Sequence, residues 1–395
     1  MKTVPETTPR IVVCMVVTLL ALGTVTWAQQ AGNASLLYYQ AFLLYEKPDD
    51  TMAQMITDFR KGTIGVNATI IEHIEKNRRV IDYVVAAANM PTCDWGYDYR
   101  QGADLALPNL PAVRRIAFLL SAEARLLAEQ GDYATALDRC LTLRKMALQT
   151  CDRTLISYLV GIALNGLANG SLQGILGLVP DDAGQLNRLR SQLTHTQEKF
   201  APLAYCLGQE ADVCAQTMRI EKADVILKMV QECDGSSADP ALARIQQADE
   251  AFFERNRTHW FSSTALVIDT LESSLPYSEM CAKLGELDKR LCAEAQDNPD
   301  ATLTAISLPA VGRIYQLTVR QQTHLNAIQT AIDLYIAKAG TGRLPDALPA
   351  DSPRDLFSGE PFEYERTDGG FILRCRAKEY PDEDKPHEYE FIVKP

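Results

Sequence analysis

Helical spacing of apolar residues runs through most of this chain, from Ser35 to about Ala339, and constrains the fold more than any other feature. Apolar residues recur three or four positions apart, which is the pattern of helices that bury one face. Prolines and a loop segment, "DGSSADP" (234–240), divide the stretch into separate helices. We therefore predict a mainly α fold, built as an irregular, solenoid-like series of helical hairpins.

The clearest local motif lies at about residues 112–150 and contains "LSAEARLLAEQGDYATALDRCLTLRKMA". It resembles one tetratricopeptide-type helical hairpin, with Gly131 in the turn and Ala136 as the small residue where the two helices cross. Two positions depart from that pattern: Glu123 occupies an apolar position, and Leu148 stands where a proline usually ends the unit. No second copy of comparable quality occurs, so the sequence predicts one hairpin and not a regular repeat.

A stretch without any charged residue, "TLISYLVGIALNGLANGSLQGILGLVP" (154–180), admits two interpretations. Three of its glycines have the GxxxG spacing of membrane helices: Gly166, Gly170 and Gly174. Its polar side chains form a stripe at every fourth position: Asn165, Asn169 and Gln173. A buried helix whose small residues allow close neighbours explains both features, and we favour it over a membrane span.

The apolar period changes from helical to alternating after Gly340. The alternating positions fall in three groups: Phe362 and Tyr364; Phe371, Leu373 and Cys375; Tyr389, Phe391 and Val393. "TDGG" (367–370) has the composition of a hairpin turn, because glycine tolerates positive φ. We predict that residues 311–395 form a long helix with a small three-stranded antiparallel β unit packed on it, after a helical body over residues 29–310.

The N-terminus has the layout of a secretory signal peptide. Lys2 and Arg10 precede an uncharged apolar run over residues 11–28, which ends at the small residue Ala28. The run is also barely long enough to span a bilayer, so an uncleaved anchor is the alternative. We expect an exported protein, periplasmic or extracellular, that loses residues 1–28 and contacts a membrane only if they are retained.

Cysteine content agrees with export. Nine cysteines follow Ala28, and an oxidising compartment favours their pairing. Five of them lie in helical sequence: Cys206, Cys214, Cys233, Cys281 and Cys292. We expect disulfides between helices there, with at least one free thiol because the number is odd.

Charge and motifs exclude several classes of function. The formal net charge is −12 and the lysines and arginines are scattered, which argues against nucleic acid as a partner. "IIEHIEK" is not the HExxH zinc motif, and no phosphate-binding or nucleophile motif occurs. The acidic segment "YPDEDKPHEY" (380–389) lacks the spacing of a calcium loop. We predict no catalytic residue, metal site or cofactor.

One irregular segment, "CDWGYDY" (93–99), is the candidate binding loop. Its aromatic rings would stack on a sugar or peptide while its acids orient the ligand. The alternative is structural: the aromatics anchor a loop between two long helices, and the cysteine forms a bridge. We favour the anchor and keep as binding candidates Cys93, Asp94, Trp95, Tyr97, Asp98 and Tyr99.

Several segments together resemble an uncharacterised group of exported bacterial proteins with a mostly helical body and a short C-terminal β unit. These segments are "LLYYQAFLL", "CDWGYDYRQG", "GDYATALDRC", "LISYLVGIAL", "DEAFFERN" and "RLPDALPADSPRDLFSGEPFEYERTDGGFIL". The last is also similar to the soluble end of type II secretion pseudopilins. It departs from them because a pseudopilin has its apolar segment at the start of the same long helix. The resemblance implies an envelope protein and supplies no reaction.

We therefore expect a non-enzymatic exported scaffold, or a binding protein for a peptide or protein partner in the cell envelope. Two alternatives stay open. One is an accessory component of a secretion or pilus-like assembly. The other is an envelope hydrolase of uncatalogued type that uses the aromatic loop as its substrate platform.

Overall fold

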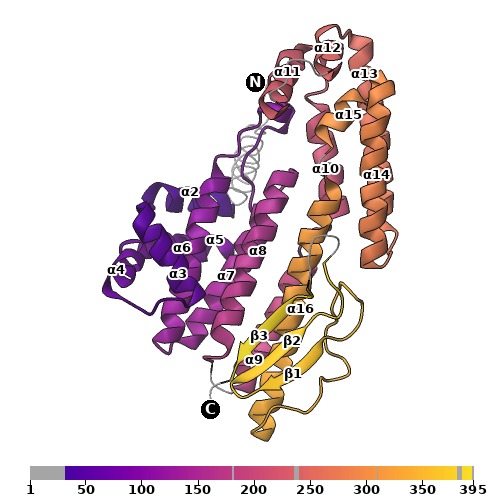
Figure 1. Cartoon of the computed structure of the whole chain (residues 1–395). Coiled ribbons are helices and arrows are strands. Elements are labelled where there is room, and N and C mark those ends of the chain that lie inside the picture. The colour runs from indigo at the N-terminus through magenta and orange to yellow at the C-terminus, as the bar shows by residue number, and fades with distance from the viewer. Residues whose placement is uncertain (1–31, 180–181, 235–239, 309, 380–384, 394–395) are drawn as a thin grey trace, which may run out of the picture.

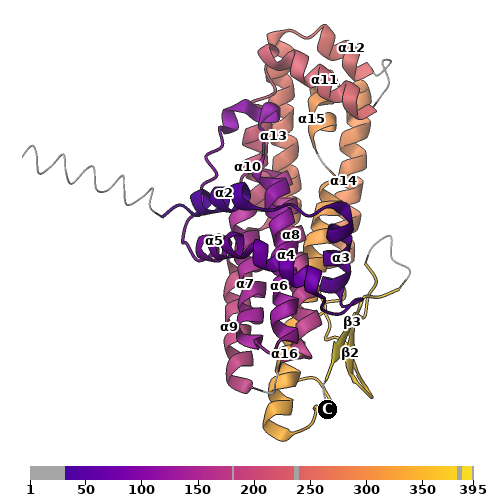
Figure 2. The same ribbon diagram turned by 90° about the vertical axis from the view of Figure 1, so that its left-hand side faces the viewer.

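An elongated helical bundle forms most of the molecule, and a small β sheet lies against one end of it (Figure 1). This computed structural model describes residues 32–179, 182–234, 240–308, 310–379 and 385–393. Figure 2 shows the long helices running roughly parallel to the long axis of the molecule. The predicted mainly α fold with a small C-terminal antiparallel β unit is confirmed. The N-terminal segment predicted as a signal peptide or anchor lies outside the described residues.

The helices fall into two groups along the chain. The first comprises α2 (Ala34–Leu44), α3 (Asp50–Lys61), α4 (Ala68–Lys76), α5 (Arg78–Ala88), the 3-10 turn η1 (Tyr99–Asp104), α6 (Asn109–Glu129), α7 (Tyr133–Thr150), α8 (Leu155–Leu176) and α9 (Ala183–Glu198). The second comprises α10 (Leu203–Ala215), η2 (Ile220–Lys222), α11 (Ala223–Asp234), α12 (Pro240–Gln246), α13 (Glu250–Glu272), α14 (Tyr277–Asp297), η3 (Pro299–Ala301), α15 (Thr302–Ser307) and α16 (Val311–Thr341).

Side-chain caps begin several of these helices. The Asp132 carboxylate accepts a hydrogen bond of 3.2 Å from the Thr135 amide at the start of α7. The Thr154 hydroxyl accepts one of 3.2 Å from the Ser157 amide at the start of α8. Each cap satisfies a backbone donor that the helix leaves unpaired, so these short polar residues determine where the helices start.

Two helix boundaries differ from the prediction. Helical spacing continues through Asn77, but the helix breaks there, because the buried Asn77 side chain bonds to the backbone of Glu46 and to the His73 carbonyl. The long α16 passes through Gly340 and ends before Gly342, which takes the left-handed conformation with φ of 76°. Helices commonly end at such a glycine.

The predicted tetratricopeptide-type hairpin corresponds to α6 and α7, which pack against each other around a turn at Gly131. Its departure at Glu123 has a physical reason. Glu123 is fully buried and accepts hydrogen bonds from Arg139 at 2.6 Å and from Arg78 of α5. A buried carboxylate needs such partners, so an ion pair replaces the apolar contact at this position.

Helix α8 packs among α6, α7 and α16. It is long and apolar enough to cross a membrane, yet half of its most apolar stretch is buried inside the described structure. The buried Asn169 of its polar stripe donates a hydrogen bond of 3.1 Å to the Gln321 carbonyl of α16. Among the three glycines at GxxxG spacing, Gly166 has a close neighbour, since a Cβ there would lie 2.8 Å from the end of the Gln321 side chain. Gly170 and Gly174 have no such close neighbour.

The sheet has the strand order β1 (Glu363–Thr367), β2 (Gly370–Arg374) and β3 (Glu388–Ile392), with both pairings antiparallel. The first hairpin turns where predicted, with Thr367 opposite Gly370. The reason for glycine differs from the predicted one. Neither turn glycine has positive φ, but a Cβ on Gly370 would lie 2.0 Å from the Phe391 carbonyl oxygen. Gly370 is therefore required for the close approach of β3.

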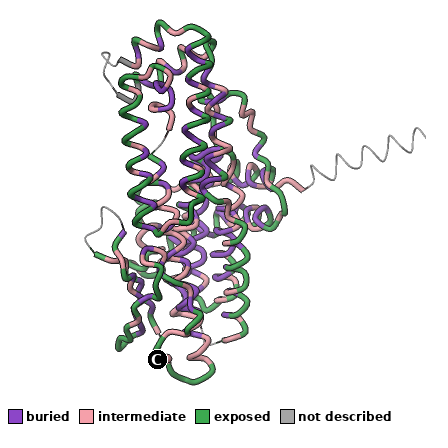
Figure 3. Tube along the Cα trace, turned by 90° about the vertical axis from the view of Figure 1, so that its right-hand side faces the viewer, coloured by how far each residue is buried: buried purple, intermediate pink, exposed green. Residues whose placement is uncertain are grey.

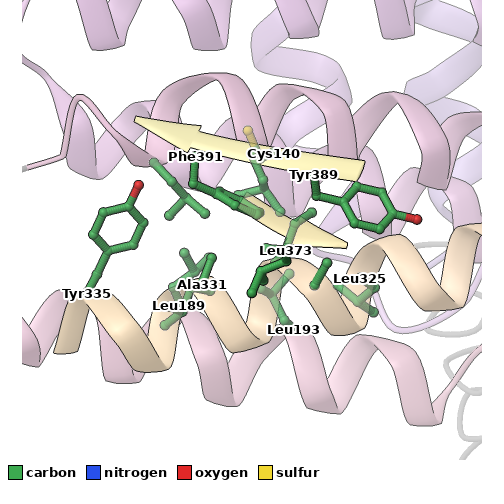
Figure 4. Close-up of a cluster of buried hydrophobic side chains, with 14 of the residues drawn as sticks. Cys140, Leu189, Leu193, Leu325, Ala331, Tyr335, Leu373, Tyr389 and Phe391 are labelled. Carbon is green, nitrogen blue, oxygen red and sulfur yellow. The ribbon is translucent and has the colours of Figure 1, made fainter. Parts of the chain in front are cut away.

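The sheet and the helical bundle share one hydrophobic core. The side chains that meet there are shown in part in Figure 4: Phe391, Tyr389 and Leu373 from the sheet, Leu325, Ala331 and Tyr335 from α16, Leu189 and Leu193 from α9, and Cys140 from α7. The Tyr335 hydroxyl also donates a hydrogen bond of 2.7 Å to the Ile392 carbonyl. Figure 3 shows buried positions continuing from this end into the middle of the molecule.

The eight cysteines whose side chains the structure describes are free thiols. The disulfides expected between helices are not formed by the described cysteines, and those expected to pair lie in different clusters of the core. Cys206 packs with one cluster, Cys214 borders a second, and Cys281 belongs to the core shared with the sheet. A disulfide needs Cα atoms within about 7 Å of each other. The Cys233 side chain and Cys14 lie outside the described part.

Candidate binding site

The loop predicted as anchor or binding platform, Cys93 to Tyr99, connects α5 to η1 and is fixed against the start of α2. The Asp94 carbonyl accepts hydrogen bonds from the Asn33 side-chain amide at 2.8 Å and the Ser35 hydroxyl at 2.7 Å. The Asp94 amide donates back to the Asn33 side chain at 2.8 Å. These three bonds tie two segments that lie far apart in the sequence.

Trp95 lies inside this junction, with 5% of its surface exposed. Its ring packs against three aromatic rings of α2, with centroid distances of 5.4 Å to Tyr38, 5.7 Å to Tyr39 and 6.2 Å to Phe42. Its indole N–H donates a hydrogen bond of 2.8 Å to the Gln149 carbonyl at the end of α7. Trp95 therefore has the contacts of an anchor.

Tyr97 and Tyr99 are half-buried and meet edge to face, with centroids 5.9 Å apart. The Tyr97 hydroxyl bonds to the Asn109 side chain at the start of α6. The Arg153 guanidinium lies 5.0 Å from the centre of the Tyr99 ring, a cation–π contact. Both rings hold neighbouring helix ends, and their exposed parts leave binding by this loop as a prediction.

Two polar residues among the binding candidates of the loop, Cys93 and Asp98, are buried or paired within the fold. Burial raises the pKa of the Cys93 thiol to about 12, so the reactive thiolate is scarce at neutral pH. The Asp98 carboxylate is paired with the Arg100 guanidinium at 2.7 Å. These residues support the loop and offer no nucleophile.

A pocket of about 280 Å³ lies where this segment continues past η1. It is enclosed by η1 and the residues after it, the first turn of α8, the second half of α10, α11 and α15. Its apolar lining comprises Leu105, Leu107, Ile156, Val213, Met218, Ile226, Met229, Leu303 and Ile306. A mainly apolar lining with few polar groups is typical of ligand pockets.

The pocket wall depends on a close approach between η1 and the end of α10. Gly102 has φ of 59°, and a Cβ there would lie 2.2 Å from the Thr217 hydroxyl oxygen. That oxygen accepts a hydrogen bond of 2.7 Å from the Ala103 amide. An ion pair between Lys222 and Asp104 also joins η1 to η2. The candidate loop thus leads directly into one wall of the pocket.

Glu210 supplies the carboxyl group in the pocket lining. One of its oxygens accepts a hydrogen bond of 3.0 Å from the Leu155 amide at the start of α8, and the other lies 3.5 Å from the Cys214 thiol. Burial raises the pKa of Glu210 above its usual value. A carboxyl group with perturbed acidity inside an apolar pocket is a common property of functional sites.

Apolar side chains are also exposed at the edge of the pocket. Ile156 has 59% of its surface exposed and Met229 has 42%, and both line the pocket. These two side chains are therefore accessible to a molecule that enters the pocket.

A second cavity of about 680 Å³ lies between the end of α5, α7 and α9, with Cys93 in its wall. Its lining includes Lys145, His195 and Lys199 and no carboxylate. Lys145 already donates a hydrogen bond of 2.6 Å to the Asn89 side chain. The polar character of this cavity makes it a poorer site for an apolar group.

The pocket was not predicted from the sequence, since its residues come from elements far apart in the chain and carry no shared motif. In the described part of the chain, no three or more His, Cys, Asp or Glu side chains are grouped so as to hold a metal ion. Comparison with protein-family models, curated proteins and solved structures gave no match to this chain. The pocket and the loop are therefore the features of this chain that point to a function.

Proposed function

We propose that this chain is a non-enzymatic binding protein of the cell envelope, and that its pocket receives an apolar side chain of a peptide or protein partner. The observation that carries the proposal is the apolar pocket that contains the Glu210 carboxyl and has Ile156 and Met229 exposed at its edge.

The size and polarity of the pocket favour a side chain over a larger ligand. Its volume of about 280 Å³ is just below the usual range of small-molecule sites, about 300–1,000 Å³. One large apolar side chain fits in such a space. The Glu210 carboxyl has lone pairs beyond those used by Leu155 and Cys214, so it can accept a hydrogen bond from a backbone N–H of the same peptide.

The aromatic loop has a supporting part in this proposal. Trp95 fixes the loop to α2 and α7, and the chain then continues through Gly102 into the pocket wall. The loop therefore holds η1 in place against α10. Because Tyr97 and Tyr99 retain exposed surface, a longer peptide can also contact them.

Export is the other part of the proposal, and it is supported by the charge and hydropathy of residues 1–28. Intact mass of the protein from its native host tests it, measured before and after reduction with thiol alkylation. A chain that starts at Gln29 supports export. A chain that retains residues 1–28 contradicts cleavage and favours the anchor.

Selection from a random peptide library, followed by affinity measurement on the full chain, tests the binding proposal. We expect the selected peptides to share a Leu, Met, Ile or Phe and to bind at least tenfold more weakly to the variants Ile156→Asp and Met229→Asp. Leu43→Asp is the matched control, because Leu43 is 87% exposed and lies on α2, away from the pocket. Equal affinities for all these variants would overturn the proposal.

A further inference from the structure

Arg144 of α7 is a buried cation without an anionic partner. Its side chain has 4% of its surface exposed. Its Nε donates to the Thr196 hydroxyl at 3.1 Å and its Nη1 to the Asn169 side-chain oxygen at 2.9 Å, and both acceptors are neutral. Within the described residues, Arg144 forms no ion pair. The Nη2 group has no protein acceptor there.

A small cavity of about 30 Å³ lies beside this guanidinium, between α7, α8, the end of α9 and α16. A water molecule needs about 10–15 Å³ of such space, so the cavity holds one or two waters or one ion of similar size. Its polar lining beside Arg144 is made of neutral groups: Asn165, Asn169, Gln197, Thr318, Gln321 and Gln322.

Several of these neutral groups have donors to spare. The side chains of Asn165, Gln197 and Gln322 line the cavity and form no hydrogen bond with other described residues. Each amide carries two N–H donors. Amide donors together with a guanidinium N–H are the groups that coordinate an anion.

The energetics favour an anion near Arg144. Burying an unpaired charge is expensive, and buried charges in proteins are paired with an opposite charge or neutralised. An arginine cannot lose its proton in the ordinary pH range, although burial lowers the pKa of Arg144 to about 10. Paired charges elsewhere in this protein, such as Glu123 with Arg139, follow the rule.

We propose that this cavity binds a small monovalent inorganic anion, chloride in ordinary salt solutions, held by Arg144 and the amide side chains around it. A volume of about 30 Å³ favours a small anion over a larger organic one. Because the lining residues come from α7, α8, α9 and α16, the bound anion joins these helices at their crossing. It stabilises the fold and takes no part in the peptide pocket.

Thermal unfolding of the full chain in sodium chloride and in sodium gluconate at equal ionic strength tests this proposal. Gluconate is too large for the cavity. We expect a midpoint about 1–2 °C higher in chloride, since an anion that binds only the folded state stabilises it by mass action. The variant Arg144→Met loses this difference. The control Arg188→Met, at an exposed position of α9, keeps it.

A second measurement does not depend on the folding of a variant. Chloride NMR of the unmodified protein should show line broadening that bromide competes away and gluconate does not. Equal midpoints in the two salts, together with no broadening beyond that of an unrelated protein of similar charge, would overturn the proposal. A chloride effect that is unchanged in a folded Arg144→Met protein would overturn it as well.

Discussion

Single residues in this protein show where charge overrides the helical pattern. Glu123 is recognisable in the sequence as an acid at an apolar position, but its partner Arg78 lies 45 residues away on another helix. No local sequence pattern predicts such a contact. Asp355 is similar: "SPRDLFSG" is readable as a turn, yet only the structure shows its buried carboxylate accepting from the Phe357 and Arg376 amides.

The ion pairs of Glu123 give the first prediction. Replacing Glu123 by alanine leaves the mostly buried Arg139 side chain without its counter-charge. Removing one partner of a buried ion pair lowers the free energy of unfolding by about 3–5 kcal/mol. Urea unfolding measures this loss. Glu129→Ala is the control, because Glu129 is partly exposed and its pair with Arg125 is worth about 1 kcal/mol or less. Equal losses for the two variants would show that the buried ion pair contributes no more to stability than the exposed one.

The second prediction concerns the anchor. Trp95→Ala removes a buried aromatic side chain and should lower the free energy of unfolding by about 3–5 kcal/mol. Phe261→Ala, at a position with 41% of its surface exposed, should cost about 1 kcal/mol or less. Chemical unfolding followed by circular dichroism compares them. A Trp95→Ala protein with unchanged stability would show that the loop is not an anchor.

At the scale of elements, apolar periodicity located most helices and the three strands. It failed where tertiary contacts decide. The break at Asn77 depends on a hydrogen bond to Glu46, and the need for Gly370 depends on the approach of Phe391 from another strand. Glu46 and Phe391 are both distant in sequence from the residues that they contact. Helix or strand propensity and apolar spacing therefore cannot predict these two features.

The contact between α16, α8 and β3 should make stability depend on pH. His324 of α16 stacks on Tyr389 with centroids 4.8 Å apart and bonds through Nε2 to the Gln173 side chain at 2.7 Å. Burial, with His387 nearby, lowers the pKa of His324 from 6.5 to about 4. The folded state therefore keeps His324 neutral, while the unfolded chain protonates it near pH 6.5.

Because the folded pKa is depressed, this contribution to stability is present above pH 6.5 and is lost as the pH falls toward 4. The full loss is about 3 kcal/mol. Urea midpoints between pH 7 and 4.5 should fall less steeply for His324→Gln than for the unmodified protein. His195→Gln is the control, since His195 is exposed on α9. Identical pH profiles for all three proteins would contradict the assignment.

At the scale of the whole molecule, the pocket and the shared core both arise from segments that are distant in sequence. The amino-acid composition of each helix is ordinary. Only the packing of the helices in the folded chain brings Glu210 beside Ile156 and Met229. The sheet was predicted to pack on the preceding helix, but its core also includes α7 and α9. Long-range packing of this kind is the feature that is hardest to predict from a single sequence.

The shared core predicts that the sheet is needed for the stability of the bundle. Deleting residues 343–395 exposes the side chains of α16 that face the sheet, such as Tyr335, which packs against Phe371 and bonds to the Ile392 carbonyl. We expect the shortened chain to associate and to unfold at a lower temperature. Analytical ultracentrifugation and thermal unfolding measure both effects. A monomeric chain with unchanged stability would mean that the β unit is an independent domain.

The pocket is tested most directly by titrating the full chain with N-phenyl-1-naphthylamine, an uncharged apolar dye that fluoresces when it leaves water. We expect saturable binding at one site, which Ile156→Asp abolishes, Leu43→Asp leaves intact and the selected peptides compete away. No saturable fluorescence, or equal binding by all the variants, would contradict the proposal that this pocket receives an apolar side chain.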